Sequence, residues 1–115
     1  MTAYGKLLRE AREQVQISLR RVSEKVGVSS AYMSRIETSD EVTPPTASMI
    51  CKLCELYQIS PYPVLCAAKR MPDEVIQYIA DHPDLLKVLH QAARGQIEPN
   101  GALFELLTSN PLENS

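Results

Sequence analysis

Several features that mark membrane and exported proteins are missing from this sequence of 115 residues. No apolar run approaches the roughly 20 residues that a helix needs to span a bilayer. At the N-terminus, Lys6, Arg9, Glu10 and Arg12 interrupt the stretch where a signal peptide would be continuously apolar. The hydrophobic content of 44% is ordinary for a soluble fold, so we expect one cytoplasmic domain with at most a small appendage.

Cysteine and histidine are also scarce, and their spacing does not favour a metal or redox centre. Cys51 and Cys54 form a CxxC pair, but Cys66, His82 and His90 supply no second paired motif for a four-ligand zinc site. A thioredoxin-type site would need a βαβ setting, which the sequence lacks. We therefore expect free thiols and no metal or cofactor, and favour a packing role for the pair over metal or redox chemistry.

Glycine is too rare for a glycine-rich phosphate loop, since the chain has four glycines and none forms such a motif. A Ser/His/Asp set and a pattern of paired carboxylates are absent as well. His82 and His90 lie on separate predicted helices and have no support as a catalytic pair. We therefore expect that the protein is not an enzyme.

Alternation of β-branched residues is nearly absent, whereas apolar residues recur at helical spacing, which predicts an all-α fold. Five helices are expected near residues 7–15, 19–26, 29–37, 46–57 and 61–69. The side chains expected to face inward from the first four are Leu7, Leu8, Ala11, Val15, Leu19, Val22, Val26, Met33, Ile36, Ile50, Leu53, Cys54 and Tyr57.

Small polar residues stand where several of these helices should begin. Ser18, Ser29 and Thr46 are suited to be N-caps, because their hydroxyl oxygens accept from backbone N–H groups of the first turn. Gly27 is suited to the left-handed turn that ends the second helix. The prolines at 44–45 prevent helix formation before Thr46, where the next helix should begin.

The sequence "MPD" at residues 71–73 marks a boundary in charge. Residues 1–70 hold ten Lys and Arg against seven Asp and Glu, whereas residues 71–115 hold two against seven. The first part suits contact with a polyanion, and the second would be repelled by one. We predict an N-terminal domain over 1–70, a C-terminal helical extension over 71–107 and a frayed tail over 108–115.

The extension should contain helices at 73–80 and from Pro83 to about Gly95, followed by a last turn between Asn100 and Leu107. Its apolar stripes admit two interpretations: they complete the monomer core, or they mediate association with a second copy. We favour a homodimer. The residues expected to mediate dimerisation are Val75, Ile76, Ile79, Leu85, Leu86 and Leu89.

Residues 4–67 contain an ordered set of motifs: "LLREAR", "ISLRRVSEKVGVSSAYMSRIE", a proline in the next loop, "TASMICKLCELYQIS" and "PYPVL". This set resembles the phage-repressor-like (XRE/Cro-type) helix-turn-helix transcriptional regulators. The resemblance implies that the third helix enters the major groove and the second crosses the DNA backbone. Contacts to base edges would come from Ser29, Ser30, Ala31, Ser34 and Arg35. Contacts to phosphates would come from Ser18, Arg20, Tyr32 and Thr43.

Among the five residues expected to contact base edges, only Arg35 can make the bidentate contact to guanine that contributes about 1–3 kcal/mol of discrimination. Serines accept or donate to several bases, and Ala31 can touch a thymine methyl group. Direct readout is therefore sparse. The resemblance also implies an internal ion pair between Arg12 and Glu37, against the alternative of two unrelated surface charges.

The sequence departs from the family pattern at three places. Gln16 stands where a glycine is usual, and Leu19 replaces a glutamine that contacts the DNA backbone. The loop "TSDEVTPP" is acidic rather than basic, so Asp40 and Glu41 should weaken binding to phosphates.

The function implied is that of a sequence-specific DNA-binding transcriptional regulator, in the first instance a repressor that binds a palindromic operator as a homodimer. The acidic loop and the small residues at 29–31 keep open a second hypothesis. This is a protein-interaction adaptor, or an antitoxin or controller-type protein, that keeps the fold with weak DNA binding and has a regulatory protein partner.

Overall fold

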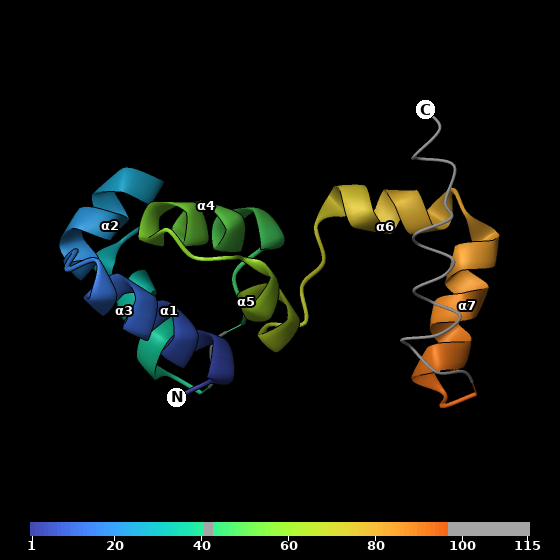
Figure 1. The fold of residues 1–115 in the computed structure, drawn as a ribbon. Helices are drawn as coiled ribbons and strands as arrows, with labels where there is room; N and C mark the ends of the chain where they lie inside the picture. Colours follow the sequence, from blue (N-terminus) through green and yellow to red (C-terminus); the bar gives the residue numbers. More distant parts are fainter. Residues whose placement is uncertain (41–42, 97–115) are drawn as a thin grey trace. The chain divides into compact units, whose positions relative to one another are not determined.

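The computed structural model describes residues 1–40 and 43–96, and the regular structure in these residues is entirely helical (Figure 1). The expected all-α fold class is confirmed. The helices are α1 (Ala3–Gln14), α2 (Leu19–Val26), α3 (Ser30–Thr38), α4 (Ala47–Tyr57), α5 (Tyr62–Ala67), α6 (Asp73–Ala80) and α7 (Pro83–Ala93). The chain divides into two compact units, which separate between Pro72 and Asp73.

The first unit is built around α1, which packs against α3, α4 and α5, while α2 packs against α3 and α4 (Figure 1). Side chains from all five helices meet in one core, because each helix turns an apolar face inward. The buried core residues are Tyr4, Leu8, Ala11, Val22, Met33, Ile36, Ile50, Leu53, Cys54, Tyr57, Val64, Leu65 and Ala68. This core holds α2 and α3 in fixed positions.

Four of the residues expected in the core are not among its buried residues: Leu19 and Val26 are partly buried against it, whereas Leu7 and Val15 lie outside it. Leu7 and Val15 are each 37% exposed, and the buried face of α1 consists of Tyr4, Leu8 and Ala11. Those three residues follow the spacing of one helical face, whereas Leu7 lies about 100° around the helix from Leu8. Val15 is the C-cap, so it no longer continues the helical face.

The predicted helix starts are confirmed at α2, α3 and α4, where the N-caps are Ser18, Ser29 and Thr46. The predicted bounds of α2 and α6 match the structure as well. Helix α5 is shorter than expected, because Pro61 is its N-cap and Lys69 adopts a left-handed φ of 55° that no helix can continue.

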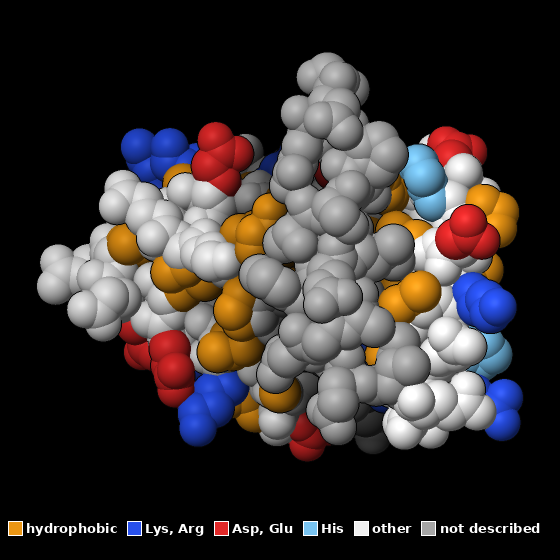
Figure 2. All heavy atoms as spheres, turned by 45° about the vertical axis from the view of Figure 1, so that its right-hand side comes forward, with side chains coloured by type: hydrophobic (Ala, Val, Ile, Leu, Met, Phe, Trp, Pro, Cys, Tyr) orange, Lys and Arg blue, Asp and Glu red, His pale blue; other side chains and the backbone are white. Residues whose placement is uncertain are grey.

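In the second unit, α6 and α7 pack against each other. The rings of Tyr78 and His82 stack with centroids 4.2 Å apart at the junction of the two helices. Leu85 is buried, whereas other apolar side chains of these helices reach the surface. Figure 2 shows such side chains, in orange, near the two histidines in pale blue. The last turn expected at 100–107 and the tail at 108–115 lie outside the described residues.

Within residues 1–40 and 43–96, no helix has both the length and the apolar character required to cross a membrane.

Candidate nucleic-acid interface

Two serine caps and one glycine fix where α2 begins and ends and where α3 begins. Ser18 Oγ accepts from the backbone N–H of Arg21 at 3.1 Å, and Ser29 Oγ accepts from that of Tyr32 at 3.0 Å. Gly27 ends α2 with φ at 77°, a conformation that is strained for residues with a Cβ. The two serine oxygens already accept hydrogen bonds, so each hydroxyl has its own proton left to donate to a phosphate or a base.

Helix α3 separates an apolar face from a polar one. Met33 and Ile36 are fully buried, as expected, and Tyr32 packs partly against the same core. The opposite face brings together four of the residues expected to approach base edges, which lie at i, i+1, i+4 and i+5. These are Ser30, Ala31, Ser34 and Arg35, of which Ser34 is half-buried and the others are exposed.

Arg35 is the exposed cation of this face, and among the described residues it makes no ion pair. Arg20 on α2 is instead paired with Glu24 at 3.4 Å, an exposed i,i+4 contact. Such contacts contribute only about 0.3–0.5 kcal/mol to stability, so a phosphate can displace Glu24. Both guanidinium groups are thus available for a nucleic acid.

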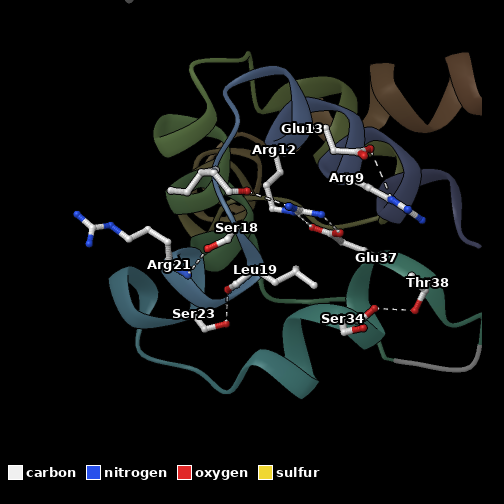
Figure 3. A network of polar contacts seen from close by, with 11 residues as sticks. Arg9, Arg12, Glu13, Ser18, Leu19, Arg21, Ser23, Ser34, Glu37 and Thr38 are labelled. Carbon is white, nitrogen blue, oxygen red and sulfur yellow. Dashed lines mark hydrogen bonds and ion pairs between the residues drawn. The ribbon is translucent and has the colours of Figure 1, made fainter.

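Arg21 lies beside these residues on α2 and was missed in the sequence analysis. Its side chain is exposed and points away from the Arg12–Glu37 pair (Figure 3). Its charge adds to that of Arg20 at the start of α2, where the backbone N–H groups also favour anions. The position of Arg21 directly after Arg20, which matches the family pattern, could have identified it from the sequence.

The predicted ion pair between Arg12 and Glu37 is confirmed. Arg12 Nε donates to Glu37 Oε2 at 2.7 Å and Nη2 donates to Oε1 at 3.1 Å, so the two groups form a fork (Figure 3). Arg12 Nη1 also donates to the carbonyl of Ile17 at 2.8 Å. The hydrogen bond with Glu37 raises the pKa of Arg12, while desolvation opposes this shift. One guanidinium therefore joins α1, the turn before α2 and the end of α3.

The turn before α2 contains Gln16 where the family pattern has glycine, and its φ is 56°. The turn closes through Gln16 N–H to the carbonyl of Glu13 and Ile17 N–H to that of Arg12, at 3.0 and 3.3 Å. The departure therefore leaves the turn geometry in place, at a cost of about 1 kcal/mol for a left-handed residue with a Cβ.

The loop that follows α3 carries the last expected contact, Thr43, which is exposed. The carboxylate of Asp40 pairs with the amino group of Met1, which offsets part of its charge. Glu41 lies outside the described residues. Arg70 donates to the carbonyls of Pro44 and Pro45 in this loop, a contact that sequence reasoning missed because its partners are 25 and 26 residues away.

The residues expected to mediate dimerisation differ in exposure. Val75, Ile76 and Leu86 are exposed, Ile79 and Leu89 are half-buried, and Leu85 is buried. Leu85 therefore presents little apolar surface to solvent, whereas Val75, Ile76 and Leu86 present the most.

The three cysteines occupy three different environments. Cys54 is fully buried in the core, and desolvation raises the pKa of its thiol to about 11. Cys51 is half-buried and Cys66 is exposed. Within the part of the chain that the structure describes, no group of His, Cys, Asp and Glu side chains is placed to hold a metal ion.

Comparison with protein families gives one match: the model of a helix-turn-helix domain fits residues 3–64. The matched segment is more than half of the chain and contains α1 to α4 with the start of α5. No curated protein and no solved structure matches the chain.

Proposed function

Because the chain belongs to the helix-turn-helix domain family, we propose that it is a sequence-specific DNA-binding transcriptional regulator. In this proposal it is a repressor that binds a palindromic operator as a homodimer. The observation that carries the proposal is the outward face of α3, which presents Arg35 without an ion-pair partner among the described residues.

In the proposed complex, α3 lies in the major groove and Arg35 donates two hydrogen bonds to one guanine. Ser29, Ser30 and Ser34 form hydrogen bonds with neighbouring base edges, and Ala31 contacts a thymine methyl group. Direct readout of one guanine gives only modest discrimination between sequences, so the shape and deformability of the DNA supply further specificity.

Phosphate contacts come from residues on both sides of α3. Ser18 donates its remaining hydroxyl proton, and Arg20 exchanges Glu24 for a phosphate. Tyr32 and Thr43 approach the backbone from α3 and from the following loop. These contacts fix the orientation of α3, while the base contacts select the sequence.

Dimerisation is assigned to the exposed apolar residues of α6 and α7, with Val75, Ile76 and Leu86 at its centre. A two-fold dimer would place two α3 helices about 34 Å apart, one turn of B-DNA, and so requires a palindromic operator. Repression follows from occupancy alone, since a dimer bound over a promoter excludes polymerase without any additional activity.

The experiment is selection of bound sites from a random DNA pool with the full chain, followed by affinity measurements at several salt concentrations. We expect a palindromic motif and an affinity that falls steeply with salt. The logarithm of the binding constant should fall against the logarithm of the salt concentration with a slope of about 0.9 per phosphate neutralised by Lys or Arg. Arg35→Ala should lower the affinity, and Arg9→Ala is its matched control for loss of charge, because Arg9 lies on α1 and pairs with Glu13. Recovery of random sequence, or an affinity insensitive to salt, would exclude the proposed function.

A second candidate function is supported by the exposed Asp40 and by the small side chains of Ser29, Ser30 and Ala31. In this alternative the chain is an adaptor or an antitoxin-type protein that keeps the fold and binds DNA weakly. Its acidic C-terminal residues would then contact a protein partner. The same selection distinguishes the two functions, because an adaptor yields no enriched motif.

A further inference from the structure

The loop at residues 43–46 is held by a side chain from the other end of the first unit. Arg70 Nη2 donates to the carbonyl of Pro44 at 2.9 Å, and Arg70 Nε donates to that of Pro45 at 3.2 Å. Pro44 and Pro45 have no N–H of their own, so they contribute no backbone donor to the loop. One planar guanidinium therefore spans two consecutive carbonyls.

The backbone of Arg70 is itself fixed by the end of α5. Its N–H donates to the carbonyl of Leu65 at 2.9 Å, and the preceding Lys69 adopts a left-handed φ of 55°. This pattern closes the helix in the manner of a Schellman motif. Leu65 is a buried core residue, so the guanidinium extends from a backbone that the core anchors.

The far end of the loop is anchored as well. Thr46 Oγ1 accepts from the N–H of Met49 at 3.1 Å and the carbonyl of Thr46 accepts from Ile50 N–H at 3.0 Å, while Pro45 is buried. Thr43 is exposed and directly precedes the first proline that Arg70 holds. Both anchors lie directly C-terminal to Thr43: Arg70 holds the two prolines that follow it, and the α4 cap fixes Thr46.

We propose that Arg70 is a positioning residue for DNA binding, which holds the loop at residues 43–46 so that Thr43 meets a phosphate. The inference rests on the proposed function. Arg70 is half-buried and two of its nitrogens are engaged with carbonyls, so it acts through the loop rather than on DNA directly. A lysine cannot reproduce the planar fork that reaches both carbonyls.

The test compares Arg70→Gln with Lys69→Asn in the full chain, on an operator fragment recovered by selection. Each variant removes one positive charge, and asparagine tolerates the left-handed conformation of residue 69. We expect Arg70→Gln to weaken binding roughly fivefold to tenfold, because the loop must then be ordered on binding. Lys69→Asn should change affinity less than twofold, and Arg70→Lys, which keeps the charge and is the milder change for folding, should fall between them.

A double-mutant cycle separates positioning from general destabilisation. The effects of Arg70→Gln and Thr43→Ala should not add, because both remove the same phosphate contact, whereas those of Arg70→Gln and Arg20→Ala should add. The dependence on salt should keep its slope in Arg70→Gln. A slope smaller by about one unit would mean that Arg70 contacts a phosphate itself, and would overturn the proposal.

Two further outcomes also overturn it: equal losses in Arg70→Gln and Lys69→Asn, or full additivity with Thr43→Ala. Either result leaves the proposed function standing, since the parent chain still binds its operator. Failure of the parent chain to bind DNA would instead reject the proposed function and this inference together.

Discussion

The two units of the chain place their apolar side chains differently. In the first unit, five helices bury their apolar faces in one shared core. In the second unit, Leu85 is the buried residue of α7, and no described residue of α6 is buried. Ile76 and Leu86 are 54% and 53% exposed, so large apolar side chains of both helices of this unit reach solvent.

In the proposed function, this difference corresponds to different roles for the two units. A closed core and fixed caps hold the α3 side chains in place, which is what recognition of base edges requires. Exposed apolar residues on α6 and α7 instead suit association, because covering them removes apolar surface from water. Binding of DNA and assembly should therefore respond to mutations in separate units.

The largest expected effect is on the stability of the first unit. Arg12→Met leaves the Glu37 carboxylate, which is 2% exposed, without its partner. We expect a loss of about 3–5 kcal/mol in the free energy of unfolding, measured by urea denaturation. Arg20→Met is the matched control, because its partner Glu24 is exposed, and it should change stability by at most about 0.5 kcal/mol.

The double variant with Met at both 12 and 37 sharpens this test. Removing both charges relieves the burial of a lone carboxylate, so stability should recover relative to Arg12→Met. If both single arginine variants lose the same stability, the Arg12–Glu37 pair has no special role in joining α1 to α3.

The next largest expected effect concerns the difference in apolar burial between the two units. Leu53→Ala removes a fully buried side chain of the first unit and should cost about 2–5 kcal/mol. Leu86→Ala removes an exposed side chain and should leave the unfolding of the first unit within about 0.5 kcal/mol of the parent. Chemical denaturation of both variants measures the free energy of unfolding of the first unit. Similar losses in the two variants would contradict the division of roles between the units.

Association should depend on the second unit. Light scattering on the full chain should give a dimer, whereas Leu86→Asp and a chain that ends at Pro72 should give monomers. The reason is that a carboxylate buried at an apolar interface is costly, and the shortened chain lacks the interface. A monomeric full chain would refute the assignment of α6 and α7 to dimerisation.

The smallest expected effect concerns the turn before α2. Gln16→Gly should stabilise the protein by about 1 kcal/mol, because φ at this position is 56° and glycine adopts it without strain. Gln14→Gly, within α1, should destabilise by about 0.5–1 kcal/mol. Thermal unfolding of the two variants measures the difference, and a loss of stability in both would show that Gln16 makes compensating contacts.

Local signals made much of the first unit predictable. The bounds of α2 followed from Ser18 and Gly27, since a cap and a left-handed turn act within a few residues of their own position. The buried face of α4 followed from helical spacing alone. The Arg12–Glu37 pair, in contrast, came from family resemblance, because no local pattern joins residues 25 positions apart.

The remaining features depend on tertiary packing. Exposure of Leu7 depends on which face of α1 the other helices cover, and Tyr4, which was not predicted, is buried instead. The contact of Arg70 with Pro44 and Pro45 depends on how α5 returns to the loop after α3. Neither is encoded in a short stretch of sequence.

The most direct test of the central proposal compares the motifs that the parent chain and Arg35→Ala select from the same random DNA pool. We expect the variant to lose its preference at one G·C pair in each half-site while it keeps the spacing of the two half-sites. Its affinity for the parent operator should fall by about 1–3 kcal/mol. An unchanged motif, with guanine still selected at every position, would contradict recognition by Arg35 on α3.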